Sequence, residues 1–236
     1  MKYRSILYIH LASLGEAIVF KFLIDYELVV CVMPHLTSFY SIIAMLTVKN
    51  MLILGGYQMY FWPQKNHLQH RRKYLKPTAL DKWIPALPYF FWIYTPLYYV
   101  FFSLAILCLP SFDTSAMHAW LMLMHSSFWF VYFPTSMPKE FRESIRRIKT
   151  DRFTKYITEL VYAHDSEENA CPSMHCAFAI FLACITFPYY PFLSIIFPIL
   201  VALSCLFTKQ HLLIDIIPGV LLGFLHGLMS VMIKYP

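Results

Sequence analysis

Charged residues are scarce in this sequence. Asp, Glu, Lys and Arg make up 14% of the 236 residues and hydrophobic residues make up 59%, whereas soluble domains carry about 25% charged residues. This composition excludes an ordinary soluble domain. It also leaves little solvated basic surface, so nucleic acid is excluded as a partner. Contact with acidic lipid headgroups accounts more simply for the formal charge of +6.

The sequence also lacks the spacings of a disulfide framework or a zinc module. Four of its six cysteines lie inside apolar runs, where cysteine behaves as a small buried side chain. Cys171, His175 and Cys176 resemble a ligand set, but a zinc site needs about four ligands with paired spacing. We therefore expect no metal and no cofactor. No internal repeat is present either, which disfavours an ion or solute transporter.

Long apolar runs dominate what remains. After a basic loop at residues 63–83, they cover residues 84–109, 116–133, 174–187, 191–207 and 212–233. None alternates with a period of two, and within lipid only helices and closed barrels satisfy the backbone. These runs therefore predict membrane-spanning helices.

Residues 5–62 are apolar as well, but charged residues and Pro34 interrupt them. They fit either two spans of about 20 residues each or one span with an interfacial helix. We predict an all-α, polytopic membrane helix bundle with a six-span core. It divides into N-terminal membrane segments (1–62), the basic loop (63–83) and a C-terminal membrane domain (84–236).

The longest polar stretch, residues 135–172, contains two amphipathic segments. In each, apolar residues recur at helical spacing among basic ones, and basic amphipathic helices of this kind lie in the membrane interface. The apolar positions are Phe141, Ile145 and Ile148 in the first segment and Phe153, Ile157, Leu160 and Val161 in the second. The pattern fits a cover over the loop side of the bundle and equally a border along the path of an entering lipid headgroup.

Crossing order predicts that three polar segments share one side of the membrane. If 84–109 and 116–133 cross in turn, the loop 63–83 and the stretch 135–172 lie on the same side, and two further crossings return residues 208–211 to it. The three segments hold six, seven and one of the 19 Lys and Arg residues. The positive-inside rule assigns such a face to the cytoplasm.

Two short stretches place histidines at the ends of apolar runs on that face. His211 precedes Asp215 by four residues, which is one helical turn, so the carboxylate can orient the imidazole as an activated nucleophile. His175 can protonate a departing oxygen and later activate an acceptor. Ser173 and the first backbone N–H groups of the next helix can hold phosphate oxygens, and Lys209 adds positive charge. This pattern predicts phosphoryl transfer.

In these residues the chain resembles the type 2 phosphatidic acid phosphatase (PAP2) superfamily of membrane lipid phosphatases and phosphotransferases. Pro172-Ser173-Met174-His175 matches the family's Pro-Ser-Gly-His motif, and Ser204, His211 and Asp215 match its third motif. The resemblance covers roughly residues 84–233. It implies that His211 forms a phosphohistidine, that Asp215 orients it, that His175 is the general acid, and that the six-helix core needs no metal.

The departures from this pattern are informative. Cys205 replaces the family's Arg, Met174 replaces its Gly, and residues 133–139 stand where its first motif, which carries Lys and Arg, is expected. We expect Lys139 and Lys209 to replace the lost cations. These changes resemble the inositol-phosphorylceramide and sphingolipid synthase branch, and a phosphodiester carries less charge than a monoester, so fewer cations suffice.

Two functions remain open from the sequence. The first is a metal-independent enzyme that hydrolyses a lipid phosphate or transfers its phospho-headgroup to a lipid alcohol. The second is a non-catalytic lipid-binding or lipid-translocating membrane protein of the same fold. Both make a membrane lipid the partner of this chain.

Overall fold

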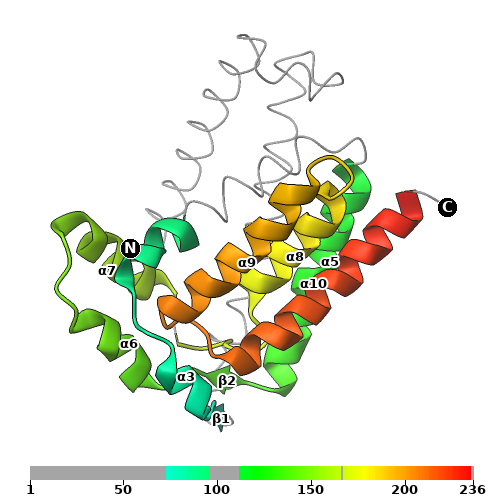
Figure 1. The fold of residues 1–236 in the computed structure, drawn as a ribbon. Coiled ribbons are helices and arrows are strands. Elements are labelled where there is room, and N and C mark those ends of the chain that lie inside the picture. The colour runs from blue at the N-terminus through cyan, green and yellow to red at the C-terminus, as the bar shows by residue number, and fades with distance from the viewer. Residues whose placement is uncertain (1–72, 96–111, 166, 235–236) are drawn as a thin grey trace, which may run out of the picture.

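The computed structural model describes residues 73–95, 112–165 and 167–234 (Figure 1). The N-terminal membrane segments expected at 1–62, the first part of the basic loop and residues 96–109 of the first apolar run lie outside the described residues.

The described chain is mostly helical, which confirms the all-α class. The helices are α3 (Ala79–Trp83), the 3-10 turn η2 (Pro88–Phe90), α5 (Phe112–Tyr132), α6 (Lys139–Arg146), α7 (Arg152–His164), α8 (Met174–Thr186), α9 (Pro191–Phe207) and α10 (Leu213–Lys234). Helices α5, α8, α9 and α10 correspond to four of the predicted apolar runs. Helices α6 and α7 correspond to the two amphipathic segments.

One expectation about local structure is wrong. The sequence predicts a loop at 63–83, but the described part of this segment contains α3 and the strand β1 (Lys73–Tyr74), which pairs in parallel with β2 (Thr135–Ser136). The helix forms because Thr78 and Asp81 make a capping box, in which each side chain accepts from the other residue's backbone N–H.

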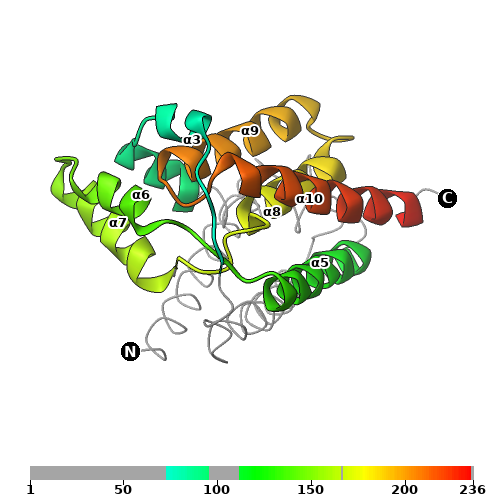
Figure 2. The same cartoon turned by 90° about the horizontal axis from the view of Figure 1, so that it is seen from below.

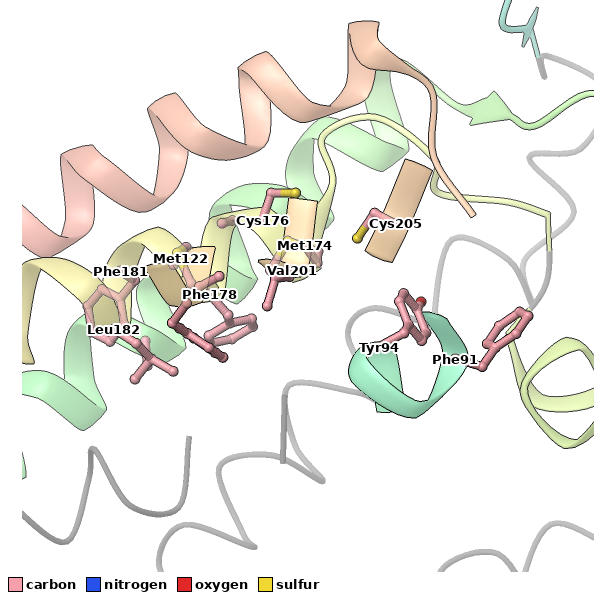
Figure 3. Packing of buried hydrophobic residues seen from close by; sticks show 14 of the residues in the cluster. Phe91, Tyr94, Met122, Met174, Cys176, Phe178, Phe181, Leu182, Val201 and Cys205 are labelled. Atoms are coloured by element: carbon pink, nitrogen blue, oxygen red, sulfur yellow. The ribbon is translucent and has the colours of Figure 1, made fainter. Parts of the chain in front are cut away.

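Helix α8 is the centre of the bundle and packs against α5, α9 and α10 (Figures 1 and 2). Most of its side chains are buried, including Phe178, Phe181 and Leu182. Figure 3 shows these residues beside Met122 of α5 and Val201 of α9. A helix that is apolar on all sides needs such a central position.

A stripe of glycines lets α10 lie directly against α8. Gly219 and Gly223 are four residues apart on one face of α10. A Cβ atom at Gly219 would lie 2.4 Å from the carbonyl oxygen of Ser173, and one at Gly223 would lie 2.1 Å from that of Ala177. Small residues at this spacing allow such close approach in apolar helix pairs, so the glycines set the separation of the two helices.

One helix within the described ranges is long and apolar enough to cross a membrane, at Leu213–Met232. The apolar helices α8 and α9 have 13 and 17 residues, shorter than the roughly 20 residues that a span needs. The six-span core is therefore not established by these helices and stays a prediction.

The polar segments gather at the end of the bundle where α8 and α10 begin and α9 ends (Figures 1 and 2). The hydroxyl of Tyr162 donates to the carbonyl of Thr208 at 3.0 Å, which ties α7 to the end of α9. The backbone N–H of Cys171 donates to Thr135 at 2.9 Å. The segments 135–172 and 208–211 thus meet at one end, as the order of the runs predicted.

Candidate phosphoryl-transfer site

The two motif histidines lie side by side although 35 residues separate them in sequence. His175 is in the first turn of α8, and His211 is in the loop between α9 and α10. Their ring centroids are 6.1 Å apart. Ser173 joins the two motifs through its backbone N–H, which donates to the carbonyl of Asp215 at 3.0 Å.

The end of α9 fixes the position of His211. Lys209 has a φ of 54°, in the left-handed region, and this reverses the chain direction. The N–H of Gln210 then donates to the carbonyl of Cys205 at 3.0 Å, and that of Lys209 to Leu206 at 3.2 Å. These two bonds form a Schellman motif, and the N–H of His211 also reaches the Cys205 carbonyl, at 3.2 Å.

Asp215 holds one face of His211. Its Oδ2 lies 3.4 Å from Nδ1 of His211 and accepts the N–H of Leu212 at 2.9 Å. Nδ1 of His211 and Oδ2 of Asp215 are close but are not aligned for a hydrogen bond. Burial lowers the pKa of His211 and is the largest single influence. The Asp215 carboxylate raises this pKa, with smaller contributions from Cys176 and Asp165, so the net pKa lies above the ordinary value.

A second acid reaches His175 through a tyrosine. The Tyr94 hydroxyl donates to Oδ2 of Asp165 at 3.3 Å and lies 3.2 Å from Nδ1 of His175. The two rings also contact each other, with centroids 4.2 Å apart. Burial raises the pKa of Asp165, while the charges of Arg142 and His211 oppose that shift. Both imidazoles therefore have a carboxylate on their Nδ1 side, directly for His211 and through Tyr94 for His175.

Arg142 is a buried cation at this site, and the sequence did not single it out. Its side chain donates to the carbonyl of Asp165 at 2.7 Å and to Oε1 of Gln210 at 2.8 Å, so it joins the loops before α8 and after α9. Its guanidinium is also 3.9 Å from the Asp165 carboxylate. The sequence contained one indication that Arg142 is buried. Arg142 lies three residues before the apolar Ile145, and residues at this spacing share a helix face.

The two lysines expected to supply positive charge are placed differently. Lys209 is buried, and its Nζ donates to the carbonyls of Asp81 at 3.3 Å and Ile84 at 2.6 Å. Lys139 is exposed at the start of α6. The structure thus uses the Lys209 ammonium to hold the end of α3, and it brings Arg142 between the two motif loops.

Ser173 and Asp81 cap the helices that carry the site. The Ser173 hydroxyl accepts the N–H of Cys176 at 3.4 Å and is the N-cap of α8. Asp81 accepts the N–H of Leu213 at 2.8 Å at the start of α10. Hydrogen bonds from Leu213 and Thr78 lower the pKa of Asp81 against the opposing effect of burial, which is the largest single influence.

One group of His, Cys and acidic side chains in the described chain converges closely enough to hold a metal ion. It consists of His175, Cys205 and His211, whose ligand atoms all lie within 4.8 Å of one another. It is not the group that the sequence suggested, because Cys205 takes the place of Cys171 and Cys176.

The PAP2 superfamily model matches residues 148–235. The match is less than half of the chain, and it includes both histidine motifs and Asp165. It supports an enzyme of the phosphatase type that acts on phosphate esters. The comparison with curated proteins and the comparison with solved structures each gave no match.

Proposed function

We propose that this chain is a membrane-embedded lipid phosphatase or phosphotransferase that works through a phosphohistidine on His211. The observation that carries the proposal is the pair of adjacent imidazoles, each with a carboxylate on its Nδ1 side. Since Nδ1 of His211 faces Asp215 at 3.4 Å, Nε2 is the nitrogen available to attack phosphorus. An oriented, buried imidazole beside an acid is the arrangement of an activated nucleophile.

The reaction proceeds in two steps. Nε2 of His211 forms a bond to phosphorus as the bond between phosphorus and the leaving oxygen breaks, and His175 gives that oxygen a proton. His175 then takes a proton from water or a lipid hydroxyl, whose oxygen attacks the phosphohistidine and releases His211. Asp215 stabilises the positive charge on His211 during both steps, and Tyr94 with Asp165 fixes the ring of His175.

The membrane setting rests on α10 and on the composition. The outward side of α10 carries large apolar residues, and the exposed fractions of Ile217, Leu221 and Met232 are 63–64%. Such a continuous apolar surface needs lipid or a partner to cover it. A lipid phosphate is therefore the substrate class that we propose for this site.

The test is trapping of the intermediate. Purified protein is incubated with a phospholipid labelled in its phosphate group and quenched in alkali, where phosphohistidine survives. We expect label on the wild-type chain and none on His211→Ala, while His175→Ala should gain label more slowly because its leaving oxygen is not protonated. Equal labelling of His211→Ala contradicts the proposal.

Product analysis then separates the two reactions. The same labelled lipid is supplied with and without ceramide or another lipid alcohol. Free phosphate as the sole labelled product identifies a phosphatase, and a labelled phospho-alcohol lipid identifies a transferase. Arg142 places a buried guanidinium between the motif loops, whereas the Lys209 ammonium is held by carbonyl groups. So little positive charge suits a phosphodiester, because a phosphodiester carries less negative charge than a monoester.

A second candidate, a non-catalytic lipid-binding or translocating protein, is favoured by one observation. Neither lysine expected to bind phosphate is directed to the histidines: Lys139 is exposed, and Lys209 holds α3. Lipid binding by the wild type and by His211→Ala, with no turnover in either, supports this candidate.

A further inference from the structure

Cys205 lies at the site without a part in the proposed reaction. It is fully buried in the last turn of α9. Its backbone carbonyl accepts the N–H groups of Gln210 and His211, so its distance from His211 is fixed by the turn. Its thiol and one nitrogen from each of His175 and His211 lie within 4.8 Å of one another.

These three side chains form a donor set that zinc prefers. A thiolate and two imidazoles can supply three of the four tetrahedral positions around Zn²⁺, with water in the fourth, at bonds of about 2.3 Å to sulfur and about 2.0–2.1 Å to nitrogen. Tetrahedral ligands at these bond lengths are about 3.3–3.6 Å apart. In the structure the three ligand atoms lie within 4.8 Å of one another, a limit that exceeds the tetrahedral spacing by about 1.2 Å. Small rotations of the two rings and the thiol would shorten these distances to the tetrahedral spacing.

The surroundings of both rings also match those of zinc ligands. Imidazoles that bind a metal through one nitrogen usually donate the N–H of the other to a carboxylate or another oxygen. Nδ1 of His211 is 3.4 Å from Asp215, and Nδ1 of His175 is 3.2 Å from the Tyr94 hydroxyl, which contacts Asp165. Nε2 of each ring is therefore the nitrogen on the metal side.

We propose that His175, Cys205 and His211 form a zinc site, and that zinc bound there blocks phosphoryl transfer. As the zinc–sulfur bond forms, the Cys205 thiol releases its proton to solvent. Zinc occupies Nε2 of His211, the atom that attacks phosphorus in the proposed function. Metal and phosphohistidine therefore exclude each other, and only this inhibitory part rests on the proposed function.

The binding experiment uses the full chain in detergent after treatment with a chelator. Zinc is titrated against a chromogenic competitor, and Co²⁺ is used as a spectroscopic probe of thiolate ligation. We expect one zinc per chain and a thiolate-to-cobalt charge-transfer band. Cys205→Ala should bind zinc at least tenfold more weakly and lose the band. Cys184→Ala is the matched control, because Cys184 is also a free thiol in the bundle and should bind as the wild type does.

Cys205→Ser keeps nearly the volume of the side chain, so it is a second variant for the case that Cys205→Ala misfolds. Thermal unfolding without zinc should be similar for Cys205→Ser and the wild type, while zinc raises the unfolding temperature only of the wild type and Cys184→Ala. Unchanged zinc binding in both Cys205 variants, or no zinc binding by the wild type at micromolar concentrations, overturns the site.

The activity experiment decides the inhibitory part separately. Each variant's turnover of a lipid phosphate is measured with increasing zinc and compared with its own rate without zinc. The half-inhibitory concentration should rise at least tenfold in Cys205→Ala. Full turnover by zinc-loaded wild type, or turnover lost in chelator and restored by zinc, overturns inhibition. Absence of turnover under all conditions counts against the proposed function, while the binding experiment still decides the zinc site.

Discussion

At the scale of residues, the two histidines are held in unequal ways. Asp215 contacts His211 directly, and the four-residue spacing made that pair predictable from sequence. Asp165 reaches His175 only through Tyr94, which lies 81 residues from the histidine in sequence. No local spacing reports a contact over such a distance. The sequence could therefore predict one oriented imidazole but not the second.

Tyr94→Phe tests the second arrangement. The change removes the hydroxyl between His175 and Asp165 and keeps the ring that contacts His175. We expect kcat to fall by about tenfold, less than the roughly 10²–10⁴-fold contribution of a whole acid–base group, because His175 itself remains, and we expect KM to be nearly unchanged. Steady-state kinetics with a lipid phosphate measures both. Tyr162→Phe is the control, because the Tyr162 hydroxyl donates to the carbonyl of Thr208 and not to a histidine. Loss of the Tyr162 hydroxyl should lower the stability of the protein and change kcat less than Tyr94→Phe does. A wild-type kcat in Tyr94→Phe contradicts the role of the hydroxyl.

Asp215→Asn tests the first arrangement through the pH profile. Neutral His211 attacks phosphorus, so activity is lost as pH falls through the pKa of His211, which Asp215 raises. Removing that charge leaves burial to lower the pKa, so the acidic limb should move to lower pH. The maximal rate should fall by about a hundredfold, because the imidazole loses its orientation. The pH dependence of kcat/KM measures this shift, and an acidic limb at the wild-type position contradicts it.

At the scale of elements, two close approaches bring the motifs together. One is the Schellman turn after α9, and the other is the glycine stripe between α10 and α8. The turn was not predictable by rule, because Lys209 rather than glycine takes the left-handed conformation. The helices themselves were predictable from apolar runs, since each run is bounded by polar or proline residues. The packing partners of α8 depend on contacts between distant segments.

Lys209→Gly and Lys209→Ala distinguish the contribution of the left-handed turn to stability from the contribution of the Lys209 ammonium. Both lose the bonds from Nζ to Asp81 and Ile84, but only glycine takes a φ of 54° without steric cost. We expect Lys209→Ala to be less stable than Lys209→Gly by about 1 kcal/mol, measured by thermal or denaturant unfolding in detergent. If Lys209 instead binds phosphate, both variants should raise KM equally, whatever their difference in stability. Equal stability of the two variants contradicts the role of the turn.

Gly223→Ala tests the contact between α10 and α8. Its Cβ would lie 2.1 Å from the carbonyl oxygen of Ala177, and the backbone cannot rotate away as a side chain can. We expect a loss of about 1–3 kcal/mol in stability, as for overpacked cores, and a larger loss of activity because the motifs move apart. Leu221→Ala on the outward side of α10, where the side chain is 64% exposed, should be nearly neutral. Equal stability of both variants contradicts the role of the stripe.

At the scale of the whole molecule, the polar end and the apolar sides divide the surface. The exposed side of α7 carries Phe153 and Tyr156 beside basic residues, with exposed fractions of 69% and 64%, while Ile157 and Val161 pack against the core. Helix periodicity predicted an apolar face but not that part of it points outward. The fold class followed from composition, and the bounds of α8 and α9 followed closely from the apolar runs 174–187 and 191–207.

Orientation in the membrane is the last prediction, and accessible cysteines test it. Lys149 lies in the exposed segment between α6 and α7, and Tyr189 lies in the exposed turn between α8 and α9. If α8 and α9 cross the membrane, these positions lie on opposite sides, and the concentration of Lys and Arg near the site places Lys149 in the cytoplasm. An impermeant maleimide added to intact cells should therefore label Tyr189→Cys, and it should label Lys149→Cys only after the cells are opened.

The unchanged chain gives the background from its own cysteines. Labelling of Lys149→Cys alone in intact cells reverses the orientation, and labelling of both positions there contradicts the crossing of α8 and α9.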